Sequence, residues 1–294
     1  WIKFVLERRA VEVPGKRFVY NNGLSLLLGE IVKSATGLDA DRYARQYLFA
    51  PLGISDFRWR KAPGGIVETA GGLSLRPRDM AKIGQLMLQQ GEWNGNTVLS
   101  SAWVATSTRA HIEDDILLAA GYGYQWWRGR TGIGPGDIEV FYAAGKGGQY
   151  IFVCPELEIV TVFTSKTDND SMGEFRPQIM MVNDVIPAML RSSPVRPTVG
   201  LDEKNLEAFV GDFQSQRLQL PLKIFREGND LFFKSPADDK GKLSPLSETK
   251  FYGTSKEAGR FTARFCRDQS GAVTHIRVQV GFGNWVFDKV VNPF

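Results

Sequence analysis

Two apolar runs lie on either side of a break at Pro155-Glu156. The first covers residues 150–154 and the second residues 157–164, and both are rich in β-branched and aromatic side chains. Such runs around a tight break predict a β-hairpin buried on both faces. A glycine-rich turn with one lysine, residues 145–148, precedes the hairpin. Glycines at a strand edge let another molecule approach the backbone, although a bulge with a solvated lysine explains the same residues.

Upstream, apolar residues recur every three or four positions and stop at a glycine: Leu24, Leu27, Leu28, Ile31, Val32 and Gly37. This spacing predicts a buried helix. Tyr20, Asn21 and Asn22 precede it and should lie on the loop that opens the helix. The simplest interpretation is that both asparagines cap the helix and that Tyr20 belongs to the core.

The same patterns place the remaining elements of the first two thirds of the chain. Helices are predicted at residues 39–48, with Tyr43, Tyr47 and Leu48 inward, from Pro77 to Gly91, from Ser101 onward, and over 172–190 with breaks at Pro177 and Pro187. Strands are predicted at residues 122–128 and 137–142. The mixture is typical of an α+β fold.

Residues 192–197 have the composition of a linker, and the pattern of predicted elements changes after them. A short helix at 202–209 is followed by short strands with turn signals between them: residues 218–225, 231–234, 250–252, 261–267, 273–280 and 285–290. These predict a small antiparallel barrel or sandwich. We therefore expect two domains, residues 1–192 and 198–294.

Composition excludes several classes of protein. The 294 residues are 43% hydrophobic and 23% charged, which is normal for a globular chain. A net charge of +4 without a basic arm or stripe argues against a nucleic-acid partner. No apolar run is long enough to span a membrane. The chain begins with Trp1, in an amphipathic helical pattern, and not with an initiator methionine, so we expect that it lacks its true N-terminus.

Histidine and cysteine chemistry is not indicated. The two histidines, His111 and His275, have no recognisable nucleophile elbow nearby. The two cysteines, Cys154 and Cys266, lie in separate β runs without a metal-like spacing, so two free thiols are expected. No metal and no organic cofactor is implied.

Tyrosine and lysine remain as candidate bases. A phenol becomes a useful base when a nearby ammonium group lowers its pKa. Tyr20 before the helix start and Lys146 on the glycine-rich turn would form such a pair if they face one cleft.

These residues resemble a family. Tyr20-Asn21-Asn22 is similar to the Tyr-x-Asn motif of class C β-lactamases and related penicillin-recognising serine hydrolases. Lys146-Gly147-Gly148 is similar to their Lys-Thr-Gly motif, with Gly147 in place of threonine. The resemblance extends from Trp1 to about Leu190, and the C-terminal part resembles the lipocalin-like β domain that follows some of these hydrolases.

The resemblance implies a fold and a set of roles. The fold would be a β-lactamase-like mixed sheet with helices, followed by a small antiparallel barrel. Tyr20 would be the general base, and Lys146 would bind a substrate carboxylate and support the Tyr20 phenolate. Asn22 would hydrogen-bond the substrate amide or the catalytic lysine. Gly148 and Gln149 would line the strand edge, where the Gln149 N–H donates into an oxyanion hole. The loss of the threonine hydroxyl at Gly147 favours an esterase or amidase of open specificity over an efficient β-lactamase.

The nucleophile of this family lies in a Ser-x-x-Lys motif upstream of Tyr-x-Asn, and no such motif precedes Tyr20 here. The pattern occurs at Ser247-Glu248-Thr249-Lys250, on an expected turn into a strand, and a catalytic pair needs a helix to place both side chains on one face. We therefore expect the nucleophile outside this chain, on a missing N-terminal segment or a complementary chain that covers the apolar face of the Leu24 helix.

The sequence is compatible with three functions. The first is a bacterial serine hydrolase that acts on a small-molecule or peptidoglycan-like substrate, by resemblance periplasmic or extracytoplasmic. The second is a non-catalytic relative that binds penicillin-like, peptidoglycan-like or acyl ligands. The third is a lipid or small-ligand binder in which an apolar cavity of the β domain does the work.

Overall fold

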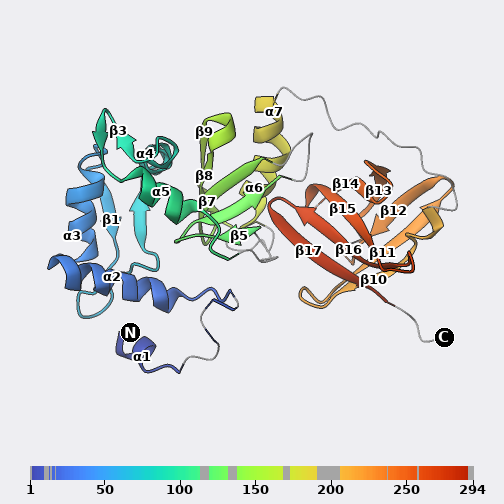
Figure 1. Cartoon of the computed structure of the whole chain (residues 1–294), viewed down its shortest axis with the longest axis horizontal. Coiled ribbons are helices and arrows are strands. Elements are labelled where there is room, and N and C mark those ends of the chain that lie inside the picture. The colour runs from blue at the N-terminus through green and yellow to red at the C-terminus, as the bar shows by residue number, and fades with distance from the viewer. Residues whose placement is uncertain are drawn as a thin grey trace. The chain divides into compact units, whose positions relative to one another are not determined.

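The computed structural model describes residues 2–9, 13, 15–16, 18–112, 119–131, 138–167, 173–190, 206–236, 238–256 and 258–290. The chain divides into two compact units. The first unit comprises residues 1–114, 122–127 and 140–166, and the second comprises residues 115–121, 128–139 and 167–294. Helices and a mixed set of sheets precede a closed antiparallel barrel (Figure 1), which confirms the predicted α+β class.

The first unit contains helices and two small hairpins: α1 (Ile2–Leu6), α2 (Asn22–Thr36), α3 (Ala40–Ala44), the π-helix η1 (Arg45–Phe49), β1 (Phe57–Trp59) with β2 (Leu73–Leu75), α4 (Pro77–Leu88), β3 (Glu92–Trp93) with β4 (Asn96–Thr97), and α5 (Ser101–Thr108). No helix among the described residues has the length and apolar composition needed to cross a membrane. The prediction that Tyr47 points inward is wrong, because its side chain is half exposed, while the neighbouring Phe49 is buried.

Helix α2 begins and ends as its sequence predicts. Asn21 is the N-cap, and its side-chain oxygen accepts a hydrogen bond from the Gly23 N–H at 2.8 Å. Gly37 closes the helix in the left-handed conformation, with φ of 73°, and its N–H donates to the Lys33 carbonyl at 2.8 Å. The helix is therefore defined by local capping chemistry at both ends.

The prediction that α2 is buried is wrong within the described residues. Leu24, Leu28 and Ile31 are 54%, 46% and 60% exposed. They lie three or four residues apart and so share one face of the helix. This leaves an apolar α2 face, made of these three residues, without cover from the described part of the chain.

A five-stranded sheet carries the glycine-rich turn. Its strands lie in the order β5 (Gly121–Tyr122), β6 (Trp127–Arg130), β7 (Glu139–Gly145), β8 (Gln149–Cys154) and β9 (Ile159–Phe163). The predicted hairpin is confirmed: β8 and β9 are antiparallel and are joined by a 3₁₀ turn, η2 (Pro155–Leu157). The single strand predicted at 122–128 is wrong, since a turn separates β5 from β6 and Gln125 has a left-handed φ of 65°.

Both faces of the interior strand β8 are buried, as the apolar run predicts. Ile151 and Val153 pack in a cluster with Met87 of α4, where Gly84 lets the helix approach the sheet. A Cβ at Gly84 would lie 2.5 Å from a methyl of Val160. On β8, Tyr150 and Phe152 stack with ring centroids 5.0 Å apart.

The second unit contains a helical segment and the barrel. The helical turns are α6 (Arg176–Met180), the π-helix η3 (Met181–Val185) and α7 (Ile186–Leu190). The barrel strands are β10 (Gly211–Ser215), β11 (Leu220–Glu227), β12 (Asp230–Lys234), β13 (Lys240–Pro245), β14 (Lys250–Ser255), β15 (Gly259–Arg267), β16 (Val273–Val280) and β17 (Gly283–Lys289). Each strand pairs with the next along the chain, and β10 pairs with β17, which closes the barrel. The expected linker and the first half of the expected helix at 202–209 lie outside the described residues.

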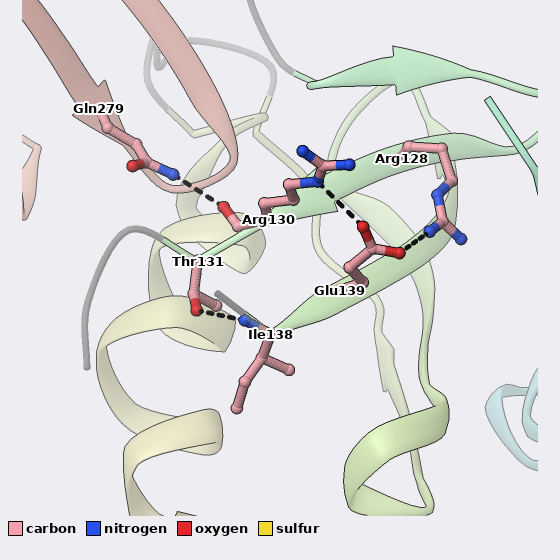
Figure 2. A network of polar contacts seen from close by, with 6 residues as sticks. All are labelled: Arg128, Arg130, Thr131, Ile138, Glu139 and Gln279. Carbon is pink, nitrogen blue, oxygen red and sulfur yellow. Dashed lines mark hydrogen bonds and ion pairs between the residues drawn. The ribbon is translucent and has the colours of Figure 1, made fainter. Parts of the chain in front are cut away.

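A polar network within the second unit joins strand ends that are distant in sequence (Figure 2). Glu139 forms ion pairs with Arg128 and Arg130 across neighbouring strands. The Gln279 side chain, from β16, donates to the Arg130 carbonyl at 2.7 Å. Thr131 accepts a hydrogen bond from the Ile138 N–H at 3.1 Å. The barrel strand β16 is thereby tied to the end of β6.

Candidate active site

Tyr20 lies on the loop before α2 and is not a core residue. Its side chain is 54% exposed. One face of the ring stacks on the indole of Trp127, at the start of β6, with 5.7 Å between ring centroids and 21° between ring planes. An exposed phenol whose ring rests on a rigid partner is accessible to substrate and held in orientation.

Trp127 belongs to an aromatic cluster of four residues, Phe18, Tyr20, Tyr122 and Trp127. Tyr122 packs edge-on against Trp127, with ring centroids 4.6 Å apart, and against Phe18 at 4.9 Å. Burial, with a smaller contribution from the neighbouring Tyr20, raises the pKa of Tyr122 to about 12. Tyr122 is therefore a neutral phenol at ordinary pH, and Tyr20 is the accessible tyrosine of the pair.

The loop between β5 and β6 is also tied to α2. The Ser25 hydroxyl donates to the Gln125 side-chain oxygen at 3.3 Å. The Ser25 carbonyl accepts a bond from the Thr69 hydroxyl at 2.7 Å. These bonds fix the helix start beside the strand that supports Tyr20.

Lys146 lies on the turn that joins β7 to β8. Gly147 and Gly148 both have a left-handed φ, of 89° and 88°. A β-branched residue is strained in this region, which gives a physical reason for glycine where the related motif has threonine. Ser165, just after β9, fixes the turn by donating to the Gly147 and Gly148 carbonyls, each at 3.0 Å. The Gln149 side chain returns a bond to the Ser165 carbonyl at 2.6 Å.

The predicted site residues all lie in the first unit. Trp127, which supports Tyr20, begins β6, and Lys146 follows β7, the next strand in the sheet. Asn22 is the exposed first residue of α2. Within the described residues no hydrogen bond or ion pair joins Tyr20 to Lys146, and the exposed Lys146 ammonium forms no ion pair. That the two side chains face one cleft stays a prediction.

The Ser247–Lys250 pattern lies where its sequence predicts, on a turn into a strand. The Ser247 hydroxyl accepts a hydrogen bond from the Lys250 N–H at 3.1 Å, and Lys250 begins β14. The two residues are not on one helix, so their side chains lack the spacing of a serine–lysine catalytic pair.

Two supporting residues were missed at the sequence level. Trp127 lies in the aromatic run that was predicted to be one strand. The sequence therefore did not indicate that Trp127 begins a separate strand. Ser165 follows the second apolar run and belongs to no motif.

In the described part of the chain, no group of three or more His, Cys, Asp and Glu side chains is arranged to hold a metal ion.

Comparisons with known proteins identify the family of the chain. A sequence model of the family described as Beta-lactamase matches residues 1–180. The 6-aminohexanoate-dimer hydrolase of Paenarthrobacter ureafaciens is 30% identical over 154 residues, 49% of this chain and 38% of that protein. A putative D-alanyl-D-alanine carboxypeptidase of Escherichia coli O157:H7 is 27% identical over 169 residues, 54% of this chain and 34% of that protein. The chain thus spans less than two fifths of either curated relative.

One solved structure extends the likeness to the barrel. The match to the crystal structure of SurE covers 97% of this chain and 71% of the SurE chain. Its TM-score is 0.50 and the sequence identity is 20%. At this identity the likeness concerns the fold alone. It includes both the helices and sheets of the first unit and the barrel of the second.

Proposed function

Since the chain belongs to the Beta-lactamase family, whose relatives here are hydrolases, we propose that it acts as a serine hydrolase through an acyl-enzyme. The serine would be supplied by residues outside these 294. Its oxygen attacks the carbonyl carbon of an ester or amide while Tyr20 takes the serine proton. The proton passes to the leaving alcohol or amine as the acyl bond forms. Water, activated by the same phenolate, then releases the acid and regenerates the serine.

The observation that carries this proposal is the environment of Tyr20. The phenol is exposed, its ring is supported by Trp127, and its neighbour Tyr122 stays protonated because burial raises its pKa. The Lys146 ammonium would favour the Tyr20 phenolate and bind a substrate carboxylate. Asn22 would bind the substrate amide. Gly148 and the Gln149 N–H would line the oxyanion side of the strand edge.

The exposed apolar α2 face supports the location of the serine. Leu24, Leu28 and Ile31 would be covered by a segment that carries Ser-x-x-Lys on a helix, contributed by a longer form of the protein or by a complementary chain. Covering large apolar side chains stabilises by about 1.5–3 kcal/mol each. The relatives' length, of which this chain spans 38% and 34%, leaves room for such a segment.

The residue after Lys146 bears on the class of substrate. Gly147 has no hydroxyl to bind a β-lactam carboxylate, so we propose an open-specificity esterase or amidase acting on a small-molecule or peptidoglycan-like substrate. The names of the relatives, an amide-dimer hydrolase and a carboxypeptidase, agree with amide cleavage. By the same likeness we propose a periplasmic or extracytoplasmic location, and a boundary between a hydrolase domain, 1–192, and a barrel domain, 198–294.

Labelling with a fluorophosphonate probe tests the proposal. The 294-residue chain should not be labelled, while the protein isolated from its source should be labelled at one serine outside this sequence. Tyr20→Phe in that protein should slow labelling, and the matched Tyr47→Phe, at a half-exposed tyrosine of η1, should not. Stoichiometric labelling of the 294-residue chain at Ser247 would overturn the proposed site. An unlabelled source protein that still binds a penicillin probe reversibly would instead establish the non-catalytic alternative.

A further inference from the structure

The barrel of the second unit is packed at one end and hollow at the other. At the packed end the rings of Phe209, Phe213, Phe251 and Phe265 fill the interior, with centroid distances of 4.5–6.3 Å. The hollow end lies toward the turns that join β12 to β13 and β14 to β15. A cavity of about 230 Å³ occupies this half of the barrel.

The cavity wall is almost entirely apolar. Its larger side chains include Leu222, Phe233, Leu243, Phe261, Trp285 and Phe287. Ala258 and Ala263 complete it with small side chains where a larger residue would fill the space. Apolar walls of this kind leave water without hydrogen-bond partners, so the cavity favours an apolar occupant.

Two glycines keep the cavity open. Gly241 on β13 and Gly253 on β14 lie against inward-facing rings of neighbouring strands. A Cβ at Gly241 would be 2.5 Å from the Phe233 ring, and one at Gly253 would be 2.6 Å from the Phe261 ring. The glycines therefore let both rings lie along the barrel wall, edge to face with 5.0 Å between centroids, rather than across the interior. The hollow persists although phenylalanines line it.

The carboxylate of Asp239, at the hollow end, already has hydrogen-bond partners. Asp239 is buried, and its carboxylate accepts hydrogen bonds from the Ser255 hydroxyl and from the Lys256 N–H, the latter at 3.1 Å. These bonds hold the turn between β14 and β15. A charged ligand would have to lose its hydration against an otherwise apolar wall, which is strongly unfavourable.

The cavity reaches the surface. Leu220, Pro221 and Pro236 line it and are themselves exposed, so a small molecule has a path into it near the start of β11. Engineered apolar cavities of roughly 150 Å³ bind benzene, whereas sites for drug-sized ligands begin at about 300 Å³. The space in this barrel falls between those sizes.

We propose that the barrel cavity is a binding site for a small uncharged apolar molecule, such as one aromatic ring with a short alkyl substituent. The ring would lie between Phe233, Phe261 and Trp285, where edge-to-face contacts with aromatic side chains are available. This site is independent of the proposed hydrolase chemistry, since no residue of that site lines the cavity.

Toluene and xenon, applied to the complete 294-residue chain, test the proposal. Crystals pressurised with xenon should show it inside the barrel beside Phe261. Toluene should cause saturable NMR shifts confined to residues of the hollow half, and benzoate, with the same ring and a charge, should bind at least about tenfold more weakly. Xenon or toluene found only elsewhere, or equal binding of benzoate and toluene, would refute the proposed site.

A matched pair of variants separates cavity occupancy from general effects. Ala263→Leu places a larger side chain in the cavity and should weaken toluene binding by about tenfold or more. Ala272→Leu makes the same change on the exposed turn after β15 and should leave binding unaltered. Unchanged toluene binding in a folded Ala263→Leu chain would contradict the proposal. If that variant does not fold, the xenon position in the unmodified protein decides.

Discussion

Tyr20 and Trp127 are more than a hundred positions apart in the sequence, yet their rings stack with 5.7 Å between centroids. The contact fixes the orientation of a side chain that is more than half exposed. Trp127 is itself held by Tyr122, which packs edge-on against it. The proposed base is therefore positioned by a strand of the sheet rather than by its own loop.

Replacing Trp127 with alanine should reduce turnover without removing the chemistry. An aromatic pair contributes about 0.5–1.5 kcal/mol, so kcat for a p-nitrophenyl ester should fall by about threefold to tenfold in the serine-containing protein. Trp127→Phe keeps a ring and should recover most of the loss. Equal rates for the alanine variant and the unaltered protein would show that the stacking does not position Tyr20.

The half-buried phenol of Tyr122 predicts a loss of stability at high pH. Its folded-state pKa is about 12, above the value of 10.0 for an unperturbed tyrosine. The folded state therefore keeps a proton that the unfolded state releases. The contribution is fully present below pH 10 and is lost as pH rises from 10 to 12.

Tyr122→Phe should make the free energy of unfolding less dependent on pH in that interval, as measured by urea titration. A matched Tyr124→Phe, at an exposed tyrosine, should behave like the unaltered chain. A slope between pH 10 and 12 that Tyr122→Phe leaves unchanged would assign the effect to other groups.

Restoring the threonine of the related motif should strain the turn at Lys146. Gly147 has φ of 89°, and a Cβ there would lie 3.3 Å from the Gln149 amide nitrogen. Gly147→Thr should lower the free energy of unfolding by about 1–3 kcal/mol, and Gly147→Asn by less, because asparagine tolerates the left-handed region. Chemical denaturation measures both, and a threonine variant as stable as the glycine form would argue against a fixed turn conformation.

Polar substitutions on the apolar α2 face should have different effects on stability with and without the proposed covering segment. Leu28→Gln combined with Ile31→Gln should change the stability of the 294-residue chain by less than about 0.5 kcal/mol per site, because the two residues are 46% and 60% exposed. In a protein that includes the proposed covering segment, the same pair should cost about 2 kcal/mol or more. Identical small effects in both contexts would mean that nothing covers this face.

Sequence patterns predicted the elements whose signals are local. The caps of α2, the proline at the start of α4 and the two apolar runs around Pro155 each specify their element by short-range chemistry. Strands β10 and β13 escaped prediction because their sequences, Gly-Asp-Phe-Gln-Ser and Lys-Gly-Lys-Leu-Ser-Pro, have low β propensity. Pairing with neighbours in the closed barrel stabilises them instead.

The candidate site shows the same limit. Tyr20 and Lys146 were found by their motifs, but Trp127 and Ser165 support them through contacts between distant segments. The exposure of Leu24 could not be read from spacing either, since a helical pattern indicates which face is apolar and not what covers it. The assignment of Tyr20, Asn22, Lys146, Gly148 and Gln149 to one catalytic cleft stays a prediction.

The five-stranded sheet, unlike the barrel, ends in β9, which has a hydrogen-bonded neighbour only on the β8 side within the described residues. Its sequence, Ile-Val-Thr-Val-Phe, is uncharged and strongly β-forming. An open edge of this composition is a template for strand addition from another molecule. The 294-residue chain on its own should therefore self-associate through β9 into β-rich aggregates at high concentration, and a lysine at Thr161 should suppress this.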